Sequence, residues 1–430
     1  MGFGASGVVC LGFVVLRQLD WGLKQELKRH FAVFSLIGLA SITTIFWTGL
    51  GPGLVTEVDA GGPGAAIYGF VLAAILQSFL AASLAEFVSA YPTEGGICHW
   101  VAAIAPRRYS GLLSFTTGWW SVSSRIFTPA STNLLYAQNS MALIALYHDT
   151  LVIKTSMTFV VYQITNIATA GVVLLGNRII PAMNRLSSTL TVSPNQLAWF
   201  ILLVTVAATA LSHNDAKLVF RTWINETGWQ NKVICFITGL VNPLSALSGL
   251  DGITHISEET PNPFRKAPLA LLRTLSIAFV TGLSYLLALM FSVQDYAALS
   301  NSSTGLLLAE LFRQVTQSRG GAFALVFLLW IAWALRSSAA FNAMLGSAVT
   351  INSVAYLIPV LTNVLQRRKV LVKGKFHVGA VPGRCVALGP LAWLTLAIIF
   401  FSFPYEQPVS AANMNYTCVC VGGIGAVALG

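Results

Sequence analysis

The chain has 430 residues, of which 55% are hydrophobic and only 9% are charged, and its mean hydropathy is +0.73. Soluble proteins are about 25% charged, so a soluble globular fold is excluded and the composition predicts an all-α polytopic membrane protein. The net charge of +10 does not indicate a nucleic-acid partner. The basic residues fall in short loops between apolar segments, which is the pattern of the positive-inside rule.

Ten apolar segments are candidate membrane spans, judged against the roughly 20 residues that a helix needs to cross a bilayer. In chain order they are 31–54, 64–90, 112–147, 157–175, 195–211, 233–254, 268–292, 321–363, 386–403 and 414–430. We expect residues 1–30 to form an N-terminal segment that is cytoplasmic at least from about residue 17. Residues 31–430 are expected to form a transmembrane domain with about 10–11 spans.

Basic residues set the expected orientation. Lys24, Lys28 and Arg29 precede the first span, and further basic pairs follow the second, fourth and sixth spans, so the N-terminus is expected to be cytoplasmic. Loops on the other side contain N-x-[ST] sequons, which are candidate glycosylation sites at Asn225, Asn301 and Asn415.

The motifs of several other protein classes are missing from the sequence. The six cysteines have no spacing typical of a metal or disulfide framework, and there is no nucleotide-binding loop or hydrolase motif. We therefore expect no catalytic residues, no metal and no cofactor.

The segment 321–363 conflicts with this topology. It is apolar for about 43 positions, too long for one ordinary span and just long enough for two. Two spans would place the next loop, which is the most basic in the chain, outside the cell. Either this segment crosses once with excess helix, or one span has been lost.

The sixth apolar segment is interrupted by polar residues near its end. Gly249, Asp251 and Gly252 break it, and an aspartate at the centre of a membrane helix costs roughly 2.5–3.5 kcal/mol on insertion scales. Glycines beside it let the helix unwind and expose backbone groups to a ligand. This pattern is typical of a transporter binding site near the middle of the membrane.

Several longer motifs resemble those of fungal amino acid/choline (GABA) permeases of the amino acid–polyamine–organocation superfamily. They are LKQELKRHFAVFSLIGLAS (23–41), SLAEFVSAYPTEGGICHW (83–100), VFRTWINETGW (219–229), GLDGITHISEETPNPFRKAP (249–268), AAFNAMLGSAV (339–349) and FPYEQPVSAANMNY (403–416). The resemblance implies an inverted repeat of five plus five helices with two further helices, in which helices 1 and 6 are unwound. It also implies secondary active transport of amino acids or related small amines, driven by protons.

Two departures from the family pattern affect this expectation. FLLWIAWALR (327–336) runs almost directly into SSAAFNAMLGSAV (337–349), so helix 9 and part of helix 8 are expected to be missing. The C-terminus is expected to be truncated within helix 12. A truncated relative that does not transport, or that senses substrate, is therefore the alternative function.

The resemblance assigns substrate contacts to both unwound helices. In helix 1 the matching residues are small or hydroxylated: Ala40, Ser41, Thr43 and Thr44. The alternative is a stripe of small residues that packs helix on helix. In helix 6 the counterparts are Ser248, Gly249, Leu250 and Asp251. Asp251 could bind a substrate ammonium group, hold a proton or cap the break.

Arg125 is an unusual charge in the third span, too far from either end to reach the membrane surface easily. It could hold a substrate carboxylate in a two-point contact, or it could pair with Asp251 or Glu86. A substrate role would favour a ligand with a carboxylate over choline, since arginine repels the quaternary ammonium group.

Glu86, His255, Glu258 and Glu259 are the candidates for gating or proton coupling. His255 can titrate near neutral pH, but a lone histidine is more often simply hydrogen-bonded, and the two glutamates could be a solvated helix end. The expected partners are a small amino acid or amine, protons and membrane lipid. The plasma membrane and the vacuolar membrane are both open as locations.

Overall fold

A computed structural model describes most of the chain. The described residues are 46–51, 53–93, 95–148, 151, 153–175, 196–210, 212–257, 260–296, 299, 307–343, 349–401, 403, 407–409 and 421–426. Within these ranges the protein is helical, and the single β-type contact is an isolated bridge between Ala60 and Asn225. The prediction of an all-α protein is confirmed.

The helices follow the predicted apolar segments closely. Their bounds are α3 Phe46–Leu50, α4 Leu54–Asp59, α5 Gly62–Ala90, α6 Gly96–Ile104, α7 Ser110–Ala145, α8 Thr155–Leu175, α10 Ala216–Arg221, α11 Lys232–Gly239, α12 Val241–Ala246, the 3₁₀ helix η1 Leu250–Ile256, α13 Pro263–Ser292, α15 Leu307–Thr316, α16 Arg319–Ala343, α17 Val349–Leu365 and α18 Ala380–Phe400. A further apolar helix runs over Gln196–Thr209.

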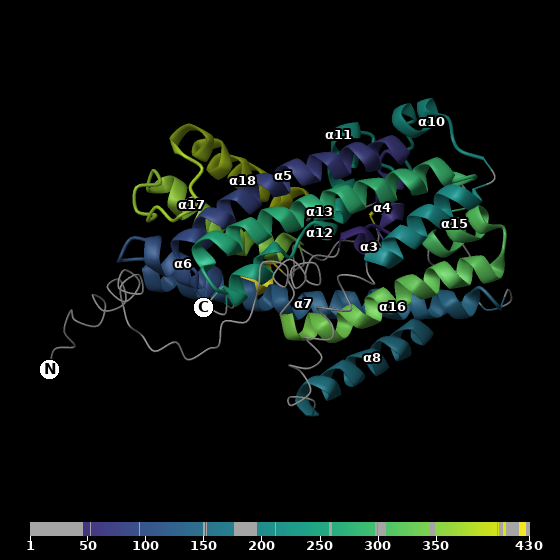
Figure 1. Ribbon diagram of the computed structural model, residues 1–430, viewed down its shortest axis with the longest axis horizontal. Coiled ribbons are helices and arrows are strands. Elements are labelled where there is room, and N and C mark those ends of the chain that lie inside the picture. Colours follow the sequence, from purple (N-terminus) through teal and green to yellow (C-terminus); the bar gives the residue numbers. More distant parts are fainter. Residues whose placement is uncertain are drawn as a thin grey trace.

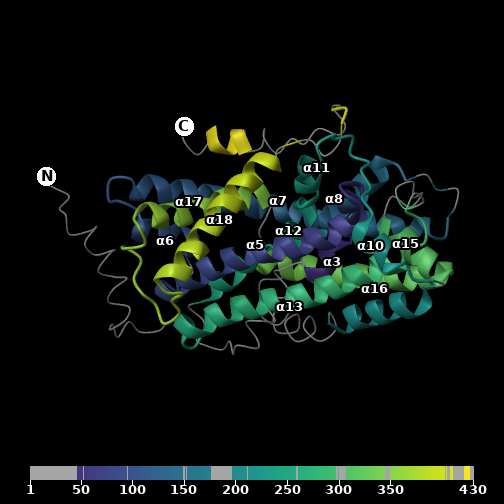
Figure 2. The same ribbon diagram turned by 90° about the horizontal axis from the view of Figure 1, so that it is seen from above.

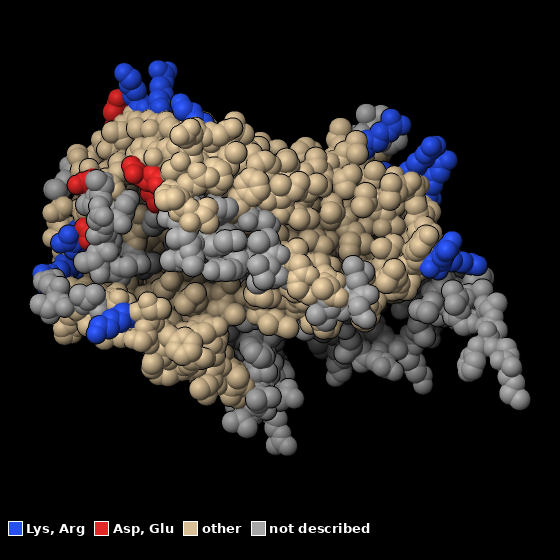
Figure 3. Space-filling model, turned by 180° about the vertical axis from the view of Figure 1, so that it is seen from behind, with Lys and Arg blue, Asp and Glu red and all other residues tan. Residues whose placement is uncertain are grey.

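Four of the described helices are long and apolar enough to cross a membrane: Gly62–Ala90, Lys232–Thr254, Pro263–Ser292 and Gly383–Phe400. Figure 3 shows Lys and Arg side chains gathered at the two ends of the long axis, with an uncharged surface between them. An apolar band between two charged ends is the surface that a bilayer requires.

The core is built around α5 and α13, which lie side by side along the long axis (Figures 1 and 2). Phe70 of α5 stacks on Phe279 of α13 with ring centroids 6.1 Å apart. Gly282 permits this close approach, because a Cβ atom there would lie 2.5 Å from the Phe70 ring. The short helices α3 and α12 pack against this pair, while α6, α8, α16 and α17 pack against α7.

The predicted break in the sixth apolar segment is present. The segment is divided into α11, α12 and η1, and Gly249 adopts a left-handed conformation with φ of 85° between the last two. Glycine takes this conformation without the steric penalty that a side chain would bring. Pro243 lacks a backbone N–H and interrupts the same stretch further upstream.

The long segment 321–363 is divided into two helices, α16 and α17. Residues 344–348 between them lie outside the described residues. The two alternatives for this segment, one crossing with excess helix or the loss of one span, therefore stay predictions. The inverted repeat of five plus five helices and the missing helix remain predictions.

The most basic loop, residues 366–379, lies at the same end of the molecule as the Arg107–Arg108 loop. Gln366 donates a hydrogen bond to the carbonyl of Ile104, at the C-terminus of α6. We call this end the basic end; it contains α6 and the α17–α18 loop on the left of Figure 1. Asn225 lies at the opposite end beside Ala60. The basic loops and the Asn225 sequon, which indicated opposite sides of the membrane, are therefore at opposite ends of the molecule.

Candidate functional site

Arg125 and Asp251 form a buried ion pair. The Arg125 Nη2 and Asp251 Oδ2 atoms are 3.7 Å apart, and the two side chains are 12% and 5% exposed. Arg125 lies near the middle of α7, about 22 Å from its nearer end at a rise of 1.5 Å per residue. Asp251 and Glu86 were the two acids considered as partners of Arg125, and in the structure the ion pair forms with Asp251.

The position of Asp251 follows from the break in its helix. Asp251 comes two residues after the left-handed Gly249 and is the second residue of the 3₁₀ helix η1. The Asp251 carbonyl accepts a hydrogen bond of 2.7 Å from the Thr254 hydroxyl, and Ser248 donates one of 2.7 Å to the Ser245 carbonyl. Local hydrogen bonds thus hold the break in one conformation and place the carboxylate toward α7.

A third element, α17, contributes two polar residues to this site that were not among the predicted site residues. Tyr356 is 5% exposed and Asn352 is 4% exposed. The Tyr356 hydroxyl lies close to Asn352 and Asp251, yet it has no hydrogen bond of normal geometry to any described residue. Asn352 and Tyr356 are four residues apart and so share one face of a helix, which was the available sequence signal for a polar site. Two polar residues in an apolar segment are a weak signal.

A second buried carboxyl group lies nearer the opposite end. Glu57 of α4 is 2% exposed, and its Oε1 atom accepts a 2.8 Å hydrogen bond from the Asn242 amide of α12. The same amide donates to the Leu50 carbonyl at 2.9 Å. Glu57 was not among the predicted site residues, although an acid beside an apolar segment is a signal that could have indicated it.

A third carboxylate, Glu86, forms what we call the basic-end clamp with Arg368 and His377. Both Glu86 oxygens lie 2.8 Å from Arg368 Nη2, and His377 Nδ1 is 3.3 Å from Oε1. The Val378 N–H also donates to Oε1 at 3.0 Å. Glu86 is at the end of α5 and the other three residues are in or beside the α17–α18 loop, so the clamp ties these elements together.

Other predicted residues are placed less completely. His255 is in η1, but its side chain is not described. The Asn225 side chain donates to the Trp229 carbonyl and accepts from Thr227. The remaining predicted residues lie outside the described ranges: Ala40, Ser41, Thr43, Thr44, Glu258, Glu259, Asn301 and Asn415.

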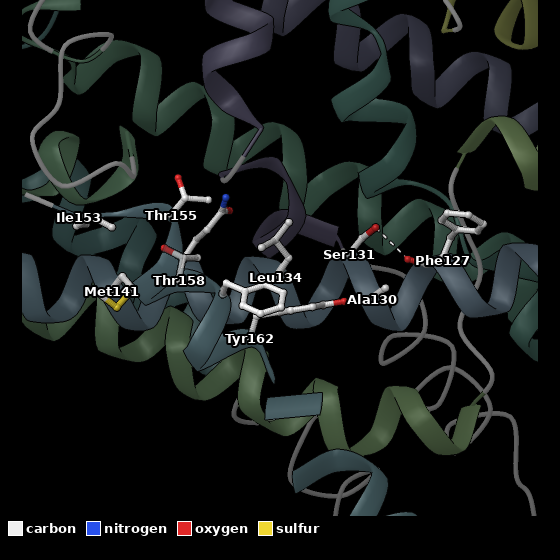
Figure 4. Close-up of a pocket in the computed structure, with 11 residues that line it drawn as sticks. Phe127, Ala130, Ser131, Leu134, Met141, Ile153, Thr155, Thr158 and Tyr162 are labelled. Atoms are coloured by element: carbon white, nitrogen blue, oxygen red, sulfur yellow. Dashed lines mark hydrogen bonds between the residues drawn. The ribbon is translucent and has the colours of Figure 1, made fainter. Parts of the chain in front are cut away.

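A groove of about 620 Å³ lies between α7 and α8, and its lining does not include the Arg125–Asp251 pair. Figure 4 shows it lined by residues such as Phe127, Leu134, Thr158 and Tyr162. All of its lining side chains are uncharged, and Phe127, Leu134 and Phe159 are exposed on the apolar band. None of these lining side chains could form an ion pair with the charged groups of an amino acid.

Comparison with known proteins identifies the family. Residues 30–336 match the model of the amino acid permease family. The chain is 30% identical to a choline transporter of Saccharomyces cerevisiae, over 93% of this chain and 80% of that protein. It is 27% identical to an amino-acid permease BAT1 homologue of Oryza sativa (98% and 93% covered) and 29% identical to a swainsonine transporter of Arthroderma benhamiae (92% and 88% covered).

These relatives are transporters rather than enzymes, as the sequence predicted, and their family together with the apolar helices makes this chain an integral membrane protein. The chain therefore belongs to the amino acid permease family of the amino acid–polyamine–organocation superfamily.

Proposed function

We propose that this protein is a secondary transporter for a zwitterionic amino acid or a closely related amine with a carboxylate. The observation that carries the proposal is the buried Arg125–Asp251 pair at the break of the sixth segment. Buried charges inside a membrane protein usually mark a substrate or ion pathway. The named relatives carry choline, amino acids or swainsonine, so small amines or amino acids are the shared chemistry.

The geometry of the pair supports a zwitterion. At 3.7 Å the two groups attract each other without a close hydrogen bond. An amino acid entering between them would place its carboxylate on Arg125, which can bind it through two N–H groups, and its ammonium group on Asp251. Each charge then keeps an opposite partner. Choline has no carboxylate, and Arg125 would repel it.

Further contacts complete the proposed site. We assign the substrate backbone contacts to Ser248, Gly249 and Leu250 beside the break, and to the small residues of the helix-1 motif: Ala40, Ser41, Thr43 and Thr44. An unwound helix leaves N–H and C=O groups free to bind a ligand.

Opening toward the basic end requires the clamp to separate, because Glu86 ties α5 to the α17–α18 loop. We therefore propose that Glu86 gates this end, and that His255, Glu258 and Glu259 are further candidates for gating or proton coupling. From the positive-inside rule we propose that the basic end faces the cytoplasm. Asn225, Asn301 and Asn415 remain candidate glycosylation sites, and protons remain the proposed driving ion in the plasma or vacuolar membrane.

Uptake into proteoliposomes tests this function. Purified protein is reconstituted and supplied with a panel of radiolabelled amino acids, 4-aminobutyrate and choline under an inward proton gradient. We expect uptake of one or more zwitterions, with loss of about tenfold or more in Arg125→Lys, because lysine cannot make the two-point contact. Arg384→Lys, at an exposed site in α18, is the matched control. Uptake of choline alone, or equal uptake by Arg125→Lys, would reject the proposal.

A truncated relative that binds substrate without transporting it is the second candidate. The alignment with the choline transporter extends over 458 positions, while the 93% of this chain that it covers is about 400 residues, so about 58 positions are gaps in this chain. The total would accommodate a missing ninth helix and part of the eighth if most of these positions lay together. Sequencing the transcript across Phe327–Asn342 tests this, because an additional in-frame segment would restore the family pattern. Substrate binding without uptake by the 430-residue form would favour the sensor.

A further inference from the structure

Glu57 is a buried carboxyl group with only one hydrogen-bond partner among the described residues. Oε1 accepts from Asn242 at 2.8 Å, whereas Oε2 has no described partner. The space around the side chain is lined by small or apolar residues of α5, α11 and α12, including Ala66, Phe236 and Pro243. An ionised carboxylate in such surroundings would lose its hydration without a compensating partner.

The charged and titratable groups on the elements around α4 are engaged elsewhere. On α11, Lys232 lies over the Trp223 ring at 5.9 Å and Cys235 contacts Thr227. The remaining ones are Asp59 of α4 itself, Tyr68 of α5, whose ring packs against Phe220, the Glu310–Arg313 pair of α15, whose atoms are 2.8 Å apart, and Glu86 of α5, which binds Arg368. Among the described residues no cation lies within ion-pair distance of Glu57. The neutral acid is therefore the form that fits.

Glu57 lies where three segments of the chain are connected, so its protonation is linked to how these segments are held together. Asn242 joins three segments, because its amide binds both Leu50 at the end of α3 and Glu57 in α4 while its own backbone belongs to α12. A Cβ atom at Gly53 would lie 2.0 Å from the Asn242 Oδ1 atom, so the α3–α4 bend fits tightly around this amide. Separation of α4 from α12 would admit water to Glu57 and allow it to ionise.

We propose that Glu57 is the proton-binding residue of this transporter, and that its protonation accompanies closure of the end opposite the basic end. A proton from the extracellular solution adds to the carboxylate and forms the neutral acid, with no other bond made or broken. Closing this end would bury the ionised Glu57 carboxylate, which is unfavourable. The closed conformation therefore holds Glu57 in its protonated form. This inference rests on the proposed transport function, which it deepens by naming the coupling site.

The first test compares wild type with Glu57→Gln, which keeps the shape and the Asn242 contact of the neutral acid. Glu226→Gln, an exposed carboxylate at the same end, is the control. In proteoliposomes containing a pH-sensitive dye, wild type and Glu226→Gln are expected to acidify the lumen on substrate addition. Glu57→Gln is expected to exchange labelled for unlabelled substrate without acidification. Acidification by Glu57→Gln comparable to wild type would overturn the proposal.

A second measurement does not depend on transport. If no substrate were transported, the proposed transport function would be rejected, but this measurement would still test whether Glu57 binds a proton. Thermal unfolding of the purified proteins in detergent is followed from pH 5 to pH 8. The unfolded chain ionises Glu57 in this range while the folded form keeps it neutral, so the stability of wild type relative to Glu57→Gln should fall as the pH rises. The decline approaches tenfold in the folding equilibrium per pH unit for one proton. A difference that does not change with pH would overturn the proposal.

Discussion

Replacing Arg125 with methionine should destabilise the protein, because Asp251 then remains as an isolated buried charge. The Asp251 side chain is 5% exposed and lies 3.7 Å from the guanidinium group. At an effective dielectric constant of about 20, that distance gives an attraction of about 4 kcal/mol. Removing one partner of a buried pair costs about 3–5 kcal/mol. Since the Arg125 side chain is 12% exposed and partly screened, we expect a loss of about 3 kcal/mol.

A double-mutant cycle measures this coupling. Arg125→Met, Asp251→Asn and the double variant are unfolded reversibly in mixed detergent micelles, and their free energies of unfolding are compared with wild type. The double variant removes both charges and should lie within about 1 kcal/mol of wild type. Arg384→Met, at an exposed position, controls for the loss of an arginine. Losses in the two single variants that simply add in the double variant would refute the reasoning, because they would show that the two charges are not coupled.

Two further predictions concern the clamp and the packing of the core. Glu86→Gln should lower the free energy of unfolding by about 2–3 kcal/mol, because it leaves Arg368 with a neutral partner in a largely buried site. Unfolding in mixed micelles measures it, and a loss below about 0.5 kcal/mol would mean that the clamp is not formed. Gly282→Val should cost about 1–3 kcal/mol by overpacking against the Phe70 ring. Gly171→Ala, which meets open space, should be close to neutral; equal losses in thermal unfolding of both variants would contradict the tight α5–α13 contact.

The helices and the break of the sixth segment could be predicted because both depend on local sequence. A run of apolar residues long enough to span a bilayer is visible as such, and Gly249 beside Asp251 marks a helix end through backbone conformation and charge. The Arg125–Asp251 pair was one of two alternatives, since a buried arginine needs an acid but the sequence does not say which acid lies near it.

The remaining contacts depend on how distant segments pack. Glu57 and Asn242 are 185 residues apart, and Glu86 and Arg368 are 282 apart. No periodicity within one helix indicates such a partner. Tyr356 and Asn352 were overlooked for a related reason: polar residues inside an apolar helix acquire a role only from the surface against which the helix packs.

The most direct test of the central claim is a structure of the protein with its transported substrate bound. We expect the substrate carboxylate within hydrogen-bond distance of the Arg125 guanidinium group and its ammonium group against Asp251, so that the direct 3.7 Å contact between the two side chains is opened. An intact Arg125–Asp251 contact with the substrate bound elsewhere, for example in the groove between α7 and α8, would contradict the account.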